Sequence, residues 1–229
     1  MHRGSGLGFA RCPFAINLKI LCEMKRIFTA TIAILIACTM FAQDKNFHVF
    51  ICLGQSNMEG AARPEKQDSL GISDRYLTMA AVDYQDGSRK MGKWYKAVPP
   101  LCRYRTGMTP VDYFGRTLIE YLPENSRVGV INVAVAGCKI EAFMKDSIDA
   151  YAQNAQVWMK PILKAYGDKP YDRLVQLARK AQKQGVISGI LLHQGESNTG
   201  DKDWPAKVKI VYESLLKDLN LKAEDVPLL

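Results

Sequence analysis

Residues that could carry out acyl transfer occur in three short polar clusters, each directly after an apolar run. The clusters are Gln55-Ser56-Asn57, Gly137-Cys138 and His193-Gln194-Gly195-Glu196. Acyl transfer needs a nucleophile, hydrogen-bond donors for the oxyanion, and a base that is oriented by an acid. A serine, a glycine backbone, an amide and a carboxylate are groups of these kinds. The clusters predict a site for acyl transfer if the fold brings them together.

Ser56 is the candidate nucleophile, because it lies on a tight turn just after an apolar run. Open α/β sheets place their ligand crevice at such strand ends, and a helix N-terminus that follows the turn would favour negative charge. The alternative interpretation is that Ser56 only caps a helix. If Ser56 is the nucleophile, the N–H groups of Ser56 and Gly137 would donate to the oxyanion of the tetrahedral intermediate. The Gln194 side chain would be a third donor. Loss of one such donor typically lowers turnover by about 10²–10³.

The elements around these clusters alternate between strands and helices. Apolar runs rich in β-branched residues predict strands at 47–53, 127–135 and 186–192. Helical patterns occupy 109–121, 146–166 with a possible break at Pro161, 170–184 and 204–219. This alternation predicts a right-handed, doubly wound α/β sheet, whose strand ends would bring the three clusters to one edge.

Residues 61–106 show no clear period and contain many prolines and glycines. A loop of this length inside a compact domain is usually functional. Its aromatic residues, together with Arg103 and Arg105, could line a sugar site, and the alternative is that Trp94 packs the loop onto the body. We take Gln55, Asn57, Arg103 and Arg105 as candidate substrate-binding residues.

The sequences GQSNM, AGCKIEAF and HQGESN resemble the SGNH hydrolases over residues 47–229. The closest branch is that of the sialate O-acetylesterases and carbohydrate esterase family six, which includes acetyl xylan esterases. The resemblance implies a flavodoxin-like, three-layer α/β/α sandwich with a parallel sheet. It also implies removal of acetyl groups from carbohydrates without a metal or an organic cofactor. Ser56 aligns with the family's nucleophile, Gly137 and Gln194 with its oxyanion donors, and Glu196 with an acid that orients the histidine or shapes the site.

The family's DxxH motif, which supplies the catalytic histidine and aspartate, does not occur in these 229 residues. His2 lies in the leader and His48 within the first strand, while His193 borders the third cluster as a weaker alternative base. We therefore expect the base beyond residue 229, in a domain whose last strand or strands and helix are missing. Val226 to Leu229 resemble the start of a further strand. The chain as given is expected to have little esterase activity.

The N-terminal residues predict export. Residues 1–23 look like an over-extended reading frame, and 24–42 like a secretory signal peptide too short to span a membrane. Cleavage would leave a partial domain at 43–229 in the periplasm or outside the cell. The alternative is a lipoprotein, anchored through Cys38.

Composition excludes several other functions. Half of the formal charge of +8 lies in residues 1–42, so the domain is only mildly basic and gives no argument for nucleic acid. Cys52, Cys102 and Cys138 permit one disulfide with one thiol left over, and no Cys/His cluster suggests a metal. GQSNMEG is neither a dinucleotide-binding nor a P-loop motif.

A non-catalytic, carbohydrate-binding relative of the same fold stays as the alternative to an esterase.

Overall fold

One sheet organises residues 43–229, with the strand order β3-β2-β4-β1-β5. Its strands are β1 (Asp44–Gly54), β2 (Tyr76–Met79), β3 (Trp94–Lys96), β4 (Arg127–Ala134) and β5 (Gly185–His193). β1 is parallel to β4 and β5, and β2 is parallel to β4, whereas β3 is antiparallel at the edge. The sheet is therefore parallel, as predicted, except for this edge strand.

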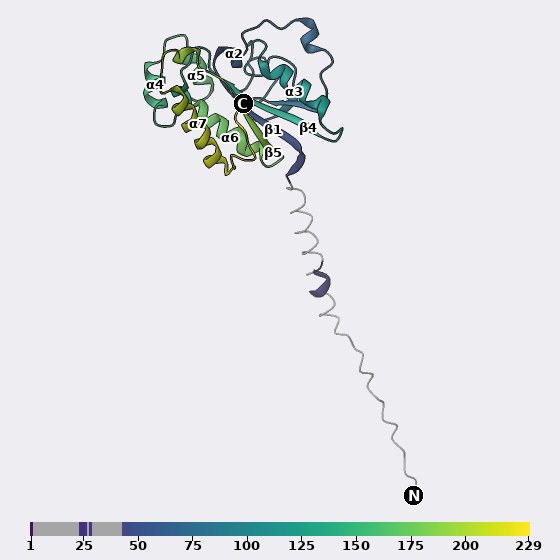
Figure 1. Ribbon diagram of the computed structural model, residues 1–229. Helices are drawn as coiled ribbons and strands as arrows, with labels where there is room; N and C mark the ends of the chain where they lie inside the picture. Colours follow the sequence, from purple (N-terminus) through teal and green to yellow (C-terminus); the bar gives the residue numbers. More distant parts are fainter. Residues whose placement is uncertain (2–22, 27, 29–42) are drawn as a thin grey trace. The chain divides into compact units, whose positions relative to one another are not determined.

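Helices cover both faces of the sheet, as Figure 1 shows for α3 on one face and α6 and α7 on the other. The helices are α2 (Ser56–Glu59), α3 (Pro110–Tyr121), α4 (Ile148–Asn154), α5 (Lys160–Ala165), α6 (Pro170–Ala181) and α7 (Trp204–Leu219). Short 3-10 turns are η1 (Lys66–Ser69), η2 (Ile140–Phe143) and η3 (Glu196–Asn198). The structure is a computed structural model that describes residues 1, 23–26, 28 and 43–229. The predicted three-layer α/β/α sandwich is confirmed.

Two hydrophobic cores arise because side chains alternate along each strand. From β1, Val49, Ile51 and Leu53 pack with the residues of α6 and α7, while Phe50 and Cys52 pack with those of α3. All of these side chains are buried. Burial on both faces explains the almost continuous apolar run of this strand.

The helix boundaries follow local signals where those are strong. Thr109 caps α3, since its hydroxyl accepts the Val111 N–H at 2.9 Å while Asp112 accepts the Thr109 N–H at 2.8 Å. This is a reciprocal capping box, and Pro110 occupies the first helical position. The predicted helix at 146–166 is instead two helices, α4 and α5. Pro161 lies in the first turn of α5, where a proline is well tolerated because the N–H that it lacks would have no partner within the helix.

Residues 61–106 are more ordered than the sequence indicated. They contain β2 and β3, so the prediction of a long irregular loop was wrong. Tyr76 in β2 is fully buried and donates a hydrogen bond to the Val111 carbonyl at 2.5 Å. The rings of Trp94 in β3 and Phe47 pack edge to face, with 5.0 Å between the ring centres. This contact agrees with a packing role for Trp94.

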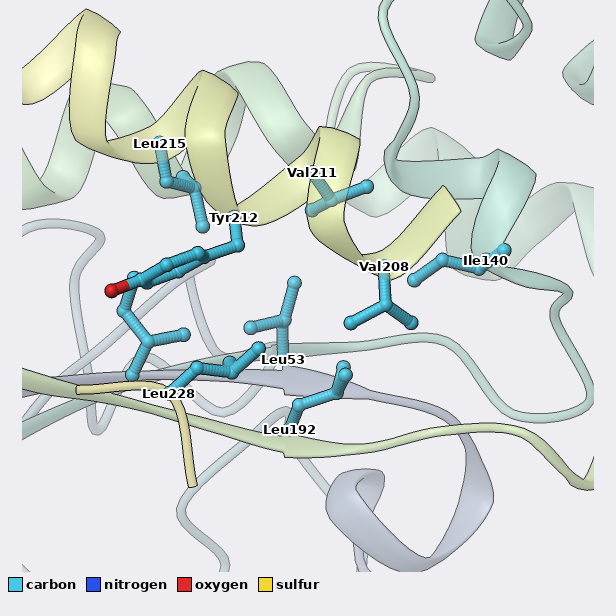
Figure 2. Close-up of a pocket in the computed structure, with 9 residues that line it drawn as sticks. Leu53, Ile140, Leu192, Val208, Val211, Tyr212, Leu215 and Leu228 are labelled. Carbon is cyan, nitrogen blue, oxygen red and sulfur yellow. The ribbon is translucent and has the colours of Figure 1, made fainter. Parts of the chain in front are cut away.

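The last residues pair with the edge of the sheet. Leu228 forms a parallel bridge with Ile190, and the Leu192 N–H donates to the Leu229 carbonyl at 2.9 Å. Leu228 also lines a small apolar pocket between the sheet and α7, with a volume of about 10 Å³ (Figure 2). A space of this size is at the lower limit for one water molecule, so the pocket belongs to the core.

The leader lies largely outside the described residues. The predicted signal peptide at 24–42 is described only at 24–26 and 28, and Cys38 is not among the described residues. No described helix has both the length and the apolar character needed to cross a membrane.

Candidate active site

The three polar clusters meet at one edge of the sheet, as predicted. Gly54 at the end of β1 is in register with Ala134 of β4 and with His193 of β5. The turn after β1 is therefore flanked by the loops that follow β4 and β5. A Cβ atom at Gly54 would lie 2.1 Å from the His193 carbonyl oxygen, so only glycine allows this close approach.

Ser56 is half-buried at the start of α2, and its hydroxyl makes no hydrogen bond within residues 43–229. The N-cap position belongs to Gln55, and no side chain caps this helix. The interpretation of Ser56 as a capping residue is therefore wrong. Its hydroxyl has no structural partner that would compete with chemistry.

Gly137 presents an unpaired N–H beside this turn. The neighbouring Ala136 N–H donates to Glu59 Oε1 at 3.3 Å, and the Cys138 N–H donates to the Val135 carbonyl at 3.1 Å. Within residues 43–229 no group accepts the Gly137 N–H or the Ser56 N–H. Gly137 has a positive φ of 67°, a conformation that glycine adopts without strain. Two backbone donors are thus available where the sequence predicts an oxyanion hole.

Gln55 is buried, with only 3% of its surface exposed. Its Oε1 accepts three N–H groups at 3.2 Å each, from the Gly195 and Ser197 backbones and the Gln194 side chain. Its Nε2 lies 3.3 Å from Ser197 Oγ, which in turn donates to the Gly137 carbonyl at 3.0 Å. Gln55 therefore joins the three loops. A substrate-binding residue would instead face solvent.

The Gln194 amide is also committed to the protein. Its Nε2 lies 2.8 Å from Asn198 Oδ1 and 3.2 Å from the Cys138 carbonyl, in addition to Gln55. Its Oε1 accepts the Trp204 indole N–H at 2.6 Å. Both amide protons are used in this network, so the side chain orders the loops. An oxyanion contact from Gln194 would require one of these bonds to be exchanged.

Glu196, Asn57 and His193 form a more exposed group. Glu196 Oε1 accepts from Asn57 Nδ2 at 3.0 Å and lies 3.4 Å from His193 Nε2. Asn57 and His193 line a crevice of about 570 Å³ together with Thr109 and Tyr113. His193 thus lies on the α3 side of the site, whereas the adjacent Gln194 points toward Trp204.

A second crevice, also of about 570 Å³, opens on the other side at Gly137. It is lined by Gly137, Lys139, Glu141, Tyr151, Asn154, Ala155, Gln156, Met159 and Ser197. Trp158, which is 51% exposed, lies next to Gly137. A Cβ atom placed on Gly137 would lie 2.6 Å from the Trp158 ring, so this ring covers the glycine directly.

The two candidate arginines take different positions. Arg103 forms an ion pair with Glu59, and the two side chains are only 18% and 11% exposed. Arg105 is exposed, and its guanidinium lies 5.2 Å from the centre of the Tyr104 ring. Glu59 and Trp158 were not singled out by sequence reasoning. Only the place of Glu59 three residues after Ser56 offered a signal.

The three thiols of the domain are buried and unpaired. Burial raises the pKa of Cys138 well above that of an ordinary thiol, and the negative charge of Glu59 raises it further. Cys138 is therefore a neutral packing residue. Among the described residues, no group of three His, Cys, Asp or Glu side chains is arranged to hold a metal ion.

The structure is an α/β/α sandwich of the type expected of the SGNH hydrolases, with Ser56 directly after the first strand. Residues 46–229 match the sequence profile of the family described as carbohydrate esterase, sialic acid-specific acetylesterase. The chain belongs to this family of carbohydrate esterases, which confirms the predicted resemblance.

Solved structures share the fold at low sequence identity. A protein from Arabidopsis thaliana is 20% identical, with a TM-score of 0.57 over 81% of this chain and 73% of that one. NanS is 16% identical, with a TM-score of 0.53 over 78% of this chain and 64% of that one. A carbohydrate acetylesterase from Xanthomonas citri is 19% identical, with a TM-score of 0.52 over 78% of this chain and 40% of that one. The chain thus spans less than two thirds of the length of the last two.

Proposed function

We propose that this protein is a serine esterase that removes O-acetyl groups from carbohydrates, with Ser56 as the nucleophile. The observation that carries the proposal is the pair of unpaired N–H groups, on Ser56 and Gly137, beside a hydroxyl without a hydrogen-bond partner. The amides on both sides of Gly137 are paired. Preorganised donors of this kind stabilise the oxyanion of a tetrahedral intermediate.

In the proposed reaction, Ser56 Oγ attacks the acetyl carbonyl carbon and transfers its proton to a base. The carbonyl oxygen becomes the oxyanion and accepts the Ser56 and Gly137 N–H groups. Collapse of the intermediate breaks the ester C–O bond, and the sugar oxygen leaves as a hydroxyl with the proton from the base. Water then hydrolyses the acetyl-serine to acetate and free Ser56. Gln55 and Gln194 hold the loops that carry these groups.

The general base is proposed to be a histidine of the DxxH type that the resemblance implies, outside residues 43–229. Within those residues His193 is the alternative, since it lies beside Glu196. Replacing His193 with alanine separates the two proposals. Loss of activity comparable to that of Ser56→Ala would make His193 the base, and a smaller effect favours the other histidine.

We propose that the sugar occupies the crevice beside Gly137. Tyr151, Asn154 and Lys139 offer hydroxyl, amide and ammonium groups to a polyol. The exposed Trp158 ring offers an apolar face next to the proposed oxyanion site. The family description names a sialic acid-specific acetylesterase, so the first substrate class that we propose is O-acetylated sialic acid, with acetylated xylan as the alternative class.

Hydrolysis of 4-nitrophenyl acetate and of an O-acetylated sialic acid by the full-length protein tests the proposal. We expect both activities to be lost in Ser56→Ala. A full-length protein that binds sialic acid but hydrolyses neither ester would instead be a carbohydrate-binding relative.

Export to the periplasm or the cell exterior, by the predicted signal peptide or a Cys38 anchor, is part of the proposal and is testable by cell fractionation.

A further inference from the structure

One carboxylate connects the three segments around the proposed oxyanion site. Glu59 is the last residue of α2, three positions after Ser56. Its Oε1 pairs with the Arg103 guanidinium and accepts the Ala136 N–H at 3.3 Å. The Glu59 side chain is 11% exposed and that of Arg103 is 18% exposed, so water screens this ion pair weakly.

The contact with Ala136 constrains Gly137. The Ala136 N–H is the donor directly before the unpaired Gly137 N–H. Because consecutive peptide planes share a Cα atom, the orientation of one limits the orientation of the next. Holding the Ala136 N–H on Glu59 therefore restricts the orientations that are open to the unpaired Gly137 N–H.

The negative charge of Glu59 would be unfavourable beside an oxyanion if no positive charge compensated it. A carboxylate this close to an oxyanion would oppose the negative charge that develops there, more strongly in a buried site than in water. Its field reaches its surroundings, since burial first and Glu59 second raise the pKa of the Cys102 thiol, to about 11. The Arg103 guanidinium supplies the compensating positive charge.

We propose that Glu59 and Arg103 are positioning residues for the oxyanion hole. Glu59 aligns the backbone of Ala136 and Gly137, and Arg103 cancels the charge of the carboxylate that does so. The proposal rests on the proposed esterase function. It gives Arg103 a role through Glu59 in place of the substrate contact predicted from the sequence.

Three variants separate alignment from charge. Glu59→Gln keeps an acceptor for the Ala136 N–H without the negative charge, whereas Arg103→Met leaves that charge uncompensated. We expect Arg103→Met to lower kcat for 4-nitrophenyl acetate about tenfold or more. The double variant Glu59→Gln/Arg103→Met should recover most of the lost kcat, because it contains no unpaired charge. Arg179→Met is the matched control, since Arg179 lies on the surface of α6 and contacts the Asp218 carbonyl.

Hydrogen–deuterium exchange gives a readout that does not depend on catalysis. The Ala136 amide should exchange at least tenfold faster in Glu59→Ala than in wild type and in Glu59→Gln, with thermal melting as the check on folding. The positioning proposal is overturned if the Ala136 amide of a folded Glu59→Ala protein exchanges as slowly as in wild type. It is also overturned if kcat of the double variant is no higher than kcat of Arg103→Met. Absence of hydrolysis by the wild-type protein would instead contradict the esterase function, and with it the catalytic part of the proposal.

Discussion

Gln194 Nε2 lies 3.2 Å from Gln55 Oε1, so two buried glutamines join the turn after β1 to the loop after β5. The same oxygen accepts the backbone N–H groups of Gly195 and Ser197. This relationship explains how Ser56 can be held in place although its own hydroxyl bonds to nothing within residues 43–229. The neighbours of Ser56 provide the rigidity, which leaves its hydroxyl available.

Gln55→Ala is predicted to destabilise the protein, because it leaves buried N–H groups without an acceptor. We expect the free energy of unfolding to fall by about 2–4 kcal/mol, measured by urea denaturation. Gln55→Glu retains the acceptor oxygen and should lose less. Gln67 is exposed, so Gln67→Ala serves as the control. Equal losses in the two alanine variants would contradict the role given to Gln55.

Gly137→Ala is predicted to lower kcat for 4-nitrophenyl acetate by about 10²–10³, the typical effect of losing one oxyanion donor. The added Cβ would meet the Trp158 ring at 2.6 Å, so the loop must move. Gly71→Ala is the matched control, because Gly71 has nearly the same φ of 66° but nothing within 4 Å of the added atom. Both variants carry a backbone strain of about 1 kcal/mol. A similar loss of activity in both would mean that strain alone is responsible.

Trp158→Ala is predicted to impair the use of sugar esters more than that of 4-nitrophenyl acetate. Loss of an aromatic face worth about 1 kcal/mol should lower the ratio of the two kcat/KM values about fivefold. Val157 is adjacent and 85% exposed, so Val157→Ala controls for a general change of the loop. An unchanged ratio in Trp158→Ala would argue against the crevice beside Gly137 as the sugar site.

Asp112 is predicted to make stability depend on pH. Burial raises the pKa of its carboxyl to about 6 from an ordinary value of 3.8. The folded state therefore holds the proton more tightly than the unfolded chain, and the free energy of unfolding falls as pH rises from about 4 to about 6. The fall is about 3 kcal/mol at most. Urea denaturation at pH 4 and pH 7 should give a smaller difference between the two pH values for Asp112→Asn than for wild type.

The large elements could be predicted from the sequence because their signals are local. The apolar runs of β1, β4 and β5 and the capping residues around Thr109 each specify an element without distant contacts. β2 has only four residues, and its pairing with β4 is decided by packing such as that of Tyr76 under α3. Such a short strand carries too weak a pattern to be recognised alone.

The candidate site was predictable to the same degree. The residue types after each strand indicated Ser56 and Gly137 as neighbours. The ion pair of Glu59 with Arg103 joins residues 44 positions apart in the sequence, so no spacing rule could indicate it. The commitment of the Gln194 amide to internal acceptors was likewise invisible, because it depends on where Gln55 and Asn198 lie in space.

Above all, we propose that Ser56 is a nucleophile beside a formed oxyanion hole. Mass spectrometry of the full-length protein treated with a fluorophosphonate tests it most directly, since this reagent forms an O–P bond with an activated serine and releases fluoride. We predict one phosphonyl adduct, on the peptide that contains Ser56, and none in Ser56→Ala. An adduct on another residue, or equal labelling of Ser56→Ala and wild type, would contradict the account.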